Sequence, residues 1–368
     1  MPTIRDVARK AGVSTATVSR WMNGRLNVRP ATAERIRSAM RCLKFTPNSV
    51  ARSLVTKESR IIGLFLADIS NPFFASLTRA VEDAASRNGY AVIICNSDSD
   101  PEKENAYISL LRQRYVDGIL FLSNSPDRSG LKTAIDGQVP FVVVDEEIKG
   151  LTPDGVFVDN ERGAYEAVAH LAKLGHRRIA HIAGPPVYST PLRLAGYRRA
   201  LDAHHVVYDP NLVRFGDFQT AGGYAAAADL LRCTPRPTAI FAGNDLMAIG
   251  AMQAAWRAGL DVGTDVAIVG FDDIPLASAL VPALTTVAQP IADLGRVAVR
   301  QLVDKIEGRG TRRRIVLPCT LRVRNSCGAM PRADGLMSSG ATPPPDARFG
   351  AGPASPNDAV GSRGTEVR

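Results

Sequence analysis

The spacing of apolar residues changes near residue 60. Within residues 3–45 apolar residues recur every three or four positions, which predicts three short helices. From residue 61 onward, short apolar runs alternate with amphipathic stretches. The runs are predicted strands: 61–67, 90–95, 118–122, 140–145, 179–184, 239–243 and 267–271. The stretches between them are predicted helices: 74–88, 102–115, 161–175, 192–204, 219–232, 244–259 and 290–308.

Uninterrupted apolar strands that alternate with helices are typical of parallel sheets with both faces covered. The length of this region suits an α/β body of two doubly wound lobes. We therefore predict four segments, which are an all-α head (1–46), a polar and basic linker with one weak helical turn at 48–55 (47–60), the two-lobed body (61–330), and a Pro/Gly/Ser-rich disordered tail (331–368).

Local signals place the helices of the head. Thr3 with Asp6 three positions later is a start signal for the first helix, and Gly12 and Val13 interrupt it. Ser14 is expected to cap a second helix at about 15–22. Thr32 is expected to open the third, whose apolar stripe includes Ile36 and Leu43.

Composition limits the class of protein. The chain has 368 residues, is 45% hydrophobic and contains no run of 18 apolar residues, so we expect no membrane span. Its first residues carry no secretory signal. The five cysteines form no C-x-x-C pair, which suits reduced thiols. These features predict a cytoplasmic protein without a metal site or other cofactor.

The excess positive charge lies at the N-terminal end. Residues 1–60 hold 13 Lys and Arg against 3 Asp and Glu, whereas the rest of the chain is close to neutral and the whole chain carries +9. A small basic module on a neutral body indicates a polyanionic partner. The alternative is a basic arm that only improves solubility.

The stretch AGVSTATVSR (11–20) has the composition of a helix-turn-helix. Ala8 is small where a second helix would cross, Gly12 tolerates left-handed backbone in the turn, and Val13 and Val18 would face inward. The other face of the second helix would then enter a DNA major groove. That face carries Thr15, Ala16, Ser19 and Arg20. The alternative is an ordinary corner within a helical bundle.

Several motifs in order resemble the LacI/GalR family of bacterial repressors. They are TIRDVARKAGVSTATVSRWMNG (3–24), PNSVARSL (47–54), IGLFLADISNPFF (62–74), GHRRIAHIAGP (175–185), RLAGYRRAL (193–201), NDLMAIGAM (244–252), VGFDD (269–273) and LTTVAQP (284–290). The resemblance runs from about Thr3 to Arg324. It implies a helix-turn-helix head on a body like the periplasmic sugar-binding proteins, and a homodimer that binds operator DNA under control of a small molecule.

The resemblance also implies DNA contacts. Thr15, Ala16 and Arg20 would read bases, and an arginine suits guanine O6 and N7. In the linker, a leucine from each subunit would wedge into the minor groove; Leu54 matches that position, and Ala51 would let the two linker helices approach. Further contacts that would set the register, mostly with phosphate, are expected from Thr3, Ser14, Thr17, Ser19, Asn23, Asn27, Thr32, Asn48 and Arg52.

In the body, the resemblance places the effector between the lobes, at the carboxyl ends of the strands. The expected effector contacts are Asp68, Asn71, Phe73, Phe74, Asp145, Arg193, Phe218, Asn244, Asp272 and Gln289. Charged groups and planar amides suit a polyhydroxyl ring, because each hydroxyl both donates and accepts. Taken singly, each has a structural alternative. Asn244 could only cap its helix, Asp272 could only cap a turn, and Arg193 could only pair with a surface acid.

The effector class is narrowed by two departures from the family pattern. Val187 and Ser189 stand where the purine-responsive pattern of the family has Arg and Thr. This favours a sugar or sugar derivative, and a nucleoside or nucleobase is the alternative.

Other functional classes fit the sequence less well. Motifs of Ser hydrolases, zinc peptidases and P-loop enzymes are absent, so we expect no enzymatic activity. His181 is expected to be a satisfied core residue, and RGTRRR (309–314) a solvated loop. A stand-alone solute-binding protein would need a signal peptide and no basic head. We therefore predict a sequence-specific transcriptional regulator that acts on a pseudo-palindromic operator.

The charge of the head predicts a strong salt dependence of DNA binding. With 6–10 phosphate contacts, raising salt from about 50 to about 200 mM should lower operator affinity by about 10³–10⁵-fold, because counterions are released on binding. A fluorescence anisotropy titration with an operator duplex at several salt concentrations measures this slope. A nearly flat response would contradict the electrostatic interpretation.

Overall fold

The computed structural model describes residues 2–22, 26–45, 58–112, 116–122, 139–145, 155–310 and 313–329. The predicted linker turn at 48–55 and the predicted C-terminal tail lie outside these ranges. So do five of the expected DNA-contacting residues, namely Asn23, Asn48, Ala51, Arg52 and Leu54.

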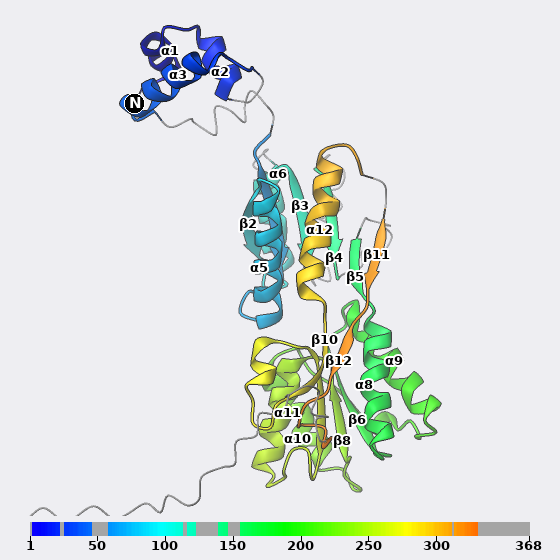
Figure 1. The fold of residues 1–368 in the computed structure, drawn as a ribbon. Helices are drawn as coiled ribbons and strands as arrows, with labels where there is room; N and C mark the ends of the chain where they lie inside the picture. The colour runs from blue at the N-terminus through cyan, green and yellow to red at the C-terminus, as the bar shows by residue number, and fades with distance from the viewer. Residues whose placement is uncertain are drawn as a thin grey trace, which may run out of the picture. The chain divides into compact units, whose positions relative to one another are not determined.

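The head consists of three helices (Figure 1). They are α1 (Ile4–Ala11), α2 (Thr15–Met22) and α3 (Pro30–Cys42). Thr3 and Asp6 form the predicted reciprocal cap of α1, and Gly12 ends it with a left-handed φ of 64°. The prediction that Thr32 opens the third helix was wrong. The helix begins at Pro30, whose fixed φ and missing N–H suit a first helical turn.

The core of the head is small. Val7, Ala8 and Ala11 of α1 pack with Val18 of α2 and with buried residues of α3. Val18 is fully buried, as the helix-turn-helix interpretation requires, and Val13 is half-buried in the turn. The apolar stripe of each helix is therefore used for packing, and the polar faces are left for another partner.

The first lobe is built on a six-stranded sheet in the order β11-β5-β4-β3-β1-β2. Each pair of neighbouring strands in this sheet is parallel. Their bounds are β1 (Ile61–Leu66), β2 (Ala91–Asn96), β3 (Gly118–Leu122), β4 (Phe141–Val144), β5 (Gly155–Val158) and β11 (Arg314–Leu317). The helices of this lobe are α5 (Pro72–Arg87), α6 (Pro101–Arg112) and α12 (Ile291–Ile306).

The second lobe has a sheet in the order β12-β10-β9-β8-β6-β7. Its strands are β6 (Ile179–Ala183), β7 (Val213–Phe215), β8 (Ala239–Ala242), β9 (Ala267–Asp272), β10 (Thr285–Ala288) and β12 (Thr320–Arg322). Its helices are α8 (Asn160–Lys173), α9 (Ser189–Ala203), α10 (Thr220–Leu231) and α11 (Asp245–Arg257), with 3-10 turns η1 (Pro210–Leu212) and η2 (Pro275–Ser278).

Both sheets are covered on two faces because alternate residues of each strand point to opposite sides. In β1, Leu64 packs with α5 and α12, whereas Phe65 packs with α6. In the second lobe, Ile240 faces the core of α10 and α11, and Phe241 faces that of α8 and α9. The prediction of two doubly wound lobes is confirmed, with one exception: β12 runs antiparallel to β10.

The chain passes between the two sheets three times within the described residues (Figure 1). It crosses from β5 to α8, from β10 to α12, and from β11 to β12. Each lobe is therefore completed by segments from distant parts of the sequence. The three crossings lie beside one another at the junction of the lobes, because β5 is paired with β11 and β10 with β12.

The structure corrects three details of the sequence interpretation. Five strands were not predicted, which are β5, β7, β10, β11 and β12. Arg314 belongs to β11 and not to a solvated loop. His181 is fully buried in β6 as expected, but only its Nδ1 is satisfied, by the carbonyl oxygen of Phe241 at 2.9 Å. Its Nε2 has no hydrogen-bond partner among the described residues.

Two further properties follow from the described residues. None of their helices is both long and apolar enough to span a lipid bilayer. All five cysteines are unpaired, and Cys95 and Cys327 are buried.

Close packing of α8 on α9 depends on Gly196. A Cβ atom at this position would collide with the carbonyl oxygen of Glu161 and lie 2.9 Å from the Cβ of Ala164. Gly196→Ala should therefore lower the free energy of unfolding by about 1–3 kcal/mol, despite the better helix propensity of alanine, because a backbone oxygen cannot rotate away. Urea denaturation of the full chain measures the change.

A matched control is Ala195→Ser, which also adds one heavy atom to α9 but at an exposed position. Its effect should stay within about 0.5 kcal/mol. Equal effects of the two substitutions would show that α8 and α9 are not packed through Gly196.

Candidate functional site

The second helix of the head presents a polar face with free side chains. Ser14 caps α2 by accepting the Thr17 N–H at 3.0 Å, and the two hydroxyls are 2.8 Å apart. Thr15, Ala16 and Arg20 are exposed. Arg20 has no ion-pair partner among the described residues. The structure thus leaves the three expected base-reading residues accessible on one helix.

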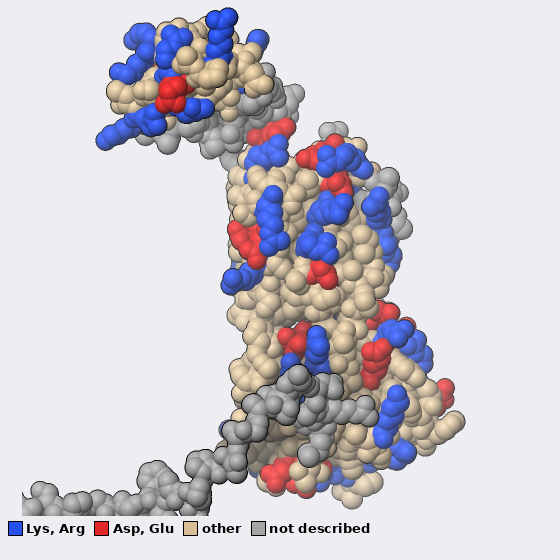
Figure 2. All heavy atoms as spheres, viewed as in Figure 1, with Lys and Arg blue, Asp and Glu red and all other residues tan. Residues whose placement is uncertain are grey.

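The other expected DNA contacts vary in exposure. Thr3, Ser14 and Asn27 are exposed, and Thr17, Ser19 and Thr32 are half-buried. Lysines and arginines cover much of the visible surface of the head, with few acidic residues among them (Figure 2). This surface has the charge that a phosphate backbone would neutralise.

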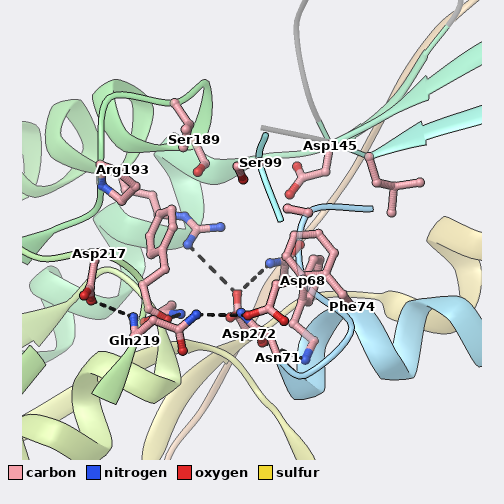
Figure 3. Close-up of a pocket in the computed structure, with 18 of the residues that line it drawn as sticks. Asp68, Asn71, Phe74, Ser99, Asp145, Ser189, Arg193, Asp217, Gln219 and Asp272 are labelled. Atoms are coloured by element: carbon pink, nitrogen blue, oxygen red, sulfur yellow. Dashed lines mark hydrogen bonds and ion pairs between the residues drawn. The ribbon is translucent and has the colours of Figure 1, made fainter. Parts of the chain in front are cut away.

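In the body, all ten predicted effector contacts line one cavity of about 340 Å³ (Figure 3). Its walls come from both lobes, so we call it the cleft. The further lining residues, which the sequence analysis did not assign as contacts, are Ala67, Ser99, Leu122, Val144, Pro185, Pro186, Val187, Ser189, Asp217 and Gln219.

Arg193 is the centre of the polar network in the cleft. It lies on α9 and is only 4% exposed. Its Nε donates to Oδ1 of Asn160 at 2.8 Å, and its Nη1 donates to the Gly243 carbonyl oxygen at 2.5 Å. Its guanidinium stacks on the ring of Phe271 at 3.7 Å. Arg193 is therefore not part of a surface ion pair, and contacts from several structural elements hold its side chain in one orientation.

Asp272 ends β9 and forms the ion pair with Arg193, at 4.0 Å between Nη1 and Oδ1. The same Oδ1 accepts a hydrogen bond from Nε2 of Gln289 at 2.7 Å. Burial raises the pKa of Asp272 above its ordinary value, although Arg193 opposes the shift. The nearby Asp245 is also buried and its pKa is raised by burial and then by Asp272, while Thr286 and the Ile274 N–H hold its carboxylate.

Asp145 follows β4 with a left-handed φ of 50°. Nδ2 of Asn160 lies 3.4 Å from its Oδ1. Burial is the largest influence and raises the pKa of Asp145 to about 6, while Arg193 acts in the opposite direction. Burial thus raises the pKa of both Asp145 and Asp272 in the cleft.

The first lobe contributes the end of β1 and the start of α5. Asn71 caps α5 by accepting the Phe73 N–H at 3.0 Å. Phe73 and Phe74 pack edge to face, with centroids 5.3 Å apart. Phe73 is 6% exposed and belongs mainly to the core, whereas Phe74 is half-buried and presents more of its ring to the cleft.

In the second lobe, Asn244 caps α11, as its structural alternative predicted. Its Oδ1 accepts the Met247 N–H at 2.9 Å, and its Nδ2 donates to the Phe218 carbonyl oxygen at 3.0 Å. Asn244 therefore also positions Phe218, whose φ of 65° is left-handed. The Phe218 ring lies against Gly184, where any Cβ would collide with it.

Two polar residues of the cleft, Asp217 and Gln219, were not predicted from the sequence. Nε2 of Gln219 donates to Oδ2 of Asp68 at 3.1 Å, a contact between residues 151 positions apart. Oδ1 of Asp217 accepts the Gln219 N–H at 2.9 Å. The sequence analysis placed Gln219 at the start of a predicted helix over 219–232, but nothing in the sequence there indicated a contact with the other lobe.

No cluster of three metal-ligating side chains occurs in the part of the chain that the structure describes. The cleft is suited to binding by hydrogen bonds and ring contacts. Together, a helix-turn-helix head and a two-lobed body with a polar cleft define a ligand-responsive DNA-binding protein.

Comparison with known proteins identifies the family. Residues 3–48 match the family model of bacterial regulatory proteins, lacI family, and residues 168–327 match that of a periplasmic binding protein-like domain. The ribose operon repressor of Halalkalibacterium halodurans is 42% identical over 308 residues, which cover 83% of this chain and 91% of that protein.

Solved structures agree. The lac repressor dimer bound to operator and the anti-inducer ONPF aligns with a TM-score of 0.80 at 31% identity, covering 89% of this chain and 99% of that chain. A LacI-family regulator from Enterococcus faecium with bound ribose aligns with a TM-score of 0.66 at 32% identity, covering 72% and 98%. This chain belongs to the lacI family of bacterial regulatory proteins. It is a DNA-binding transcriptional regulator under small-molecule control and not an enzyme.

The raised pKa of Asp145 predicts how stability depends on pH. The folded carboxyl keeps its proton up to about pH 6, whereas an unfolded aspartate loses it near pH 4, so stability falls as pH rises between these values. Asp145→Asn removes this loss. Because Asp145 is only half-buried, the variant should gain about 1–2 kcal/mol of unfolding free energy relative to the native chain between about pH 4.5 and pH 7.

Urea denaturation without ligand at a series of pH values tests this. Asp229→Asn removes an exposed carboxylate of α10 and supplies the baseline. A parallel pH dependence of the native chain and Asp145→Asn would contradict the prediction.

Proposed function

We propose that this regulator is a cytoplasmic repressor whose operator affinity is controlled by a sugar or sugar derivative bound in the cleft. The observation that carries the proposal is that Arg193, Asp272 and Gln289 line the same cleft as the aromatic side chains of Phe74 and Phe218. Charged and amide groups suit ring hydroxyls, and aromatic faces suit the apolar face of a sugar. The ribose named for two of the relatives supports the same class.

The head would bind the operator through α2. Thr15, Ala16 and Arg20 would read base edges, and the arginine suits guanine. Contacts with phosphates would set the register. For the linker residues Asn48, Ala51, Arg52 and Leu54, the proposal rests on the family pattern alone, with Leu54 as the wedge that opens the minor groove.

A homodimer would place two heads on a pseudo-palindromic operator. The edge strand β2 supports this, because Ile93 and Ile94 are 40% and 47% exposed there. Apolar side chains on an unpaired edge are a liability for a monomer. The solved lac repressor, to which this chain is similar, is a dimer on its operator, which supports the same oligomeric state.

Effector binding would act on DNA by changing the arrangement of the lobes. Gln289 lies directly after β10, where the chain crosses to α12, and Asn160 lies where it crosses from β5. A ligand that engages these residues contacts the crossings themselves. It shifts operator affinity only as far as its affinity differs between the two arrangements.

A nucleoside or nucleobase is the second candidate effector. Phe74 and Phe218 in the lining favour it, since a flat base would stack on their rings. Val187 and Ser189, which lie in the cleft, argue against a purine because they lack the Arg and Thr of the purine-responsive pattern. A thermal-shift screen of the full chain against sugars and nucleosides separates the two. Stabilisation by nucleosides alone would overturn the sugar assignment.

Two substitutions test the division of labour. Asp272→Asn keeps the shape of the side chain but removes the charge beside Arg193, so effector affinity should fall at least about tenfold while operator affinity without effector is kept. Leu54→Ala should weaken operator binding at least about tenfold and leave effector affinity unchanged. Calorimetry and DNA anisotropy on the same preparations measure both. If each variant lost both activities, the assignment of separate roles would be wrong.

A further inference from the structure

The charged side chains that line the cleft are almost all negative. Among the described lining residues, four are aspartates, Asp68, Asp145, Asp217 and Asp272, and one is an arginine, Arg193. No lysine or histidine joins them. A ligand that enters this cleft therefore meets an excess of carboxylates.

The single cation is already committed to the protein. Arg193 uses Nε and Nη1 for Asn160 and Gly243, and it pairs with Asp272 and stacks on Phe271. A phosphate or carboxylate on the ligand would have to compete with these partners. The arginine thus offers little compensation for a second negative charge.

The cleft is also rich in hydrogen-bond acceptors. Oε1 of Gln289 is buried and has no hydrogen-bond partner in the described residues, while its Nε2 is bound to Asp272. An unpaired buried acceptor is costly until a donor reaches it. Each hydroxyl of a sugar carries one proton to donate, so a hydroxyl-rich ligand would satisfy both the amide oxygen and the carboxylates.

Two of the carboxylates meet at one glutamine that joins the lobes. Gln219 donates its side-chain N–H to Asp68 of the first lobe and its backbone N–H to Asp217 of the second (Figure 3). A negative group bound beside Gln219 would face carboxylates from both lobes. Like charges brought together in a partly desolvated site repel strongly, which is a common source of specificity.

We propose that the effector is an uncharged, hydroxyl-rich sugar, and that Asp68 and Asp217 reject its phosphorylated and carboxylated analogues. The inference rests on the sugar-binding function proposed above and names the chemical class more narrowly. Asp68 and Asp217 are specificity-determining residues in this scheme, whereas the buried Oε1 of Gln289 accepts a proton from a ligand hydroxyl.

Matched pairs of ligands test the proposal on the full chain. Calorimetry at neutral pH compares ribose with ribose 5-phosphate, glucose with glucose 6-phosphate, and galactose with galacturonate. For each neutral sugar that binds, the anionic partner should bind at least about a hundredfold more weakly. An anionic partner that binds as tightly or more tightly overturns this inference and leaves the sugar function standing. If no member of any pair binds, the sugar function fails, and the inference fails with it.

Substitution of Asp68 and Asp217 tests whether these two residues reject anionic ligands. The double variant Asp68→Asn with Asp217→Asn keeps an oxygen acceptor at each position for the Ser70 and Gln219 N–H groups. It should narrow the affinity ratio between neutral and anionic partners at least about tenfold, mainly by tighter binding of the anion. Asp229→Asn on α10 is the matched control and should leave the ratio unchanged.

The ratio of two affinities separates specificity from structural damage. A variant that is merely destabilised loses affinity for both partners equally and keeps the ratio. An unchanged ratio in the double variant therefore overturns the role of Asp68 and Asp217.

Discussion

The polar architecture of the body depends on keeping one buried guanidinium satisfied. Burying a charge costs free energy unless hydrogen-bonding or charged partners surround it. Removing one partner of a buried charge destabilises a protein more than replacing the whole group of partners by apolar residues. Arg193 is held by α8 through Asn160, by the end of β8 through the Gly243 carbonyl oxygen, and by the end of β9 through Asp272. Three elements that are distant in sequence must therefore meet at one point of the sheet edge, where α8 begins and β8 and β9 end.

This requirement also links the cleft to the crossings between the lobes. Asn160 begins α8 directly after the first crossing, and Gln289 precedes α12 at the second. The Asn160 side chain accepts a hydrogen bond from Arg193 directly. The Gln289 side chain is linked to Arg193 through Asp272, to which it donates a hydrogen bond. Under the proposed function, a ligand that changes the hydrogen bonds of this network would act directly on the segments that join the two lobes.

The sequence predicted the layers of the body well because their strands are continuous apolar runs. Of the missed strands, β5 is also a buried apolar run but has only four residues, and the other four lack that signal for physical reasons. In β10, Thr285 and Thr286 are fully buried, and their hydroxyls are hydrogen-bonded to Cys327 and Asp245. This core strand therefore contains polar residues and does not appear as an apolar run in the sequence. In β11, Arg314 and Val316 alternate with half-buried residues at a sheet edge. The strands β7 and β12 have three residues each, too few for a periodicity to show.

The cleft residues were predictable to the same degree and for related reasons. Motif positions at strand ends gave ten residues that the structure brings around one cavity, because parallel strands end at a common edge. Asp217 and Gln219 escaped, since their place depends on how the second lobe approaches the first. No local pattern encodes the contact of Gln219 with Asp68 across 151 positions.

The small size of the head gives this arrangement its regulatory use. Its described residues include only seven buried apolar side chains, which is little for a separately folded unit. Under the proposed function, the basic surface of the head supplies an electrostatic share of DNA affinity that any duplex receives. Specific operator binding typically exceeds non-specific binding by about 4–10 kcal/mol. Under the proposed function, an effector whose affinity differs by a few kcal/mol between two arrangements of the lobes would be enough to change operator occupancy.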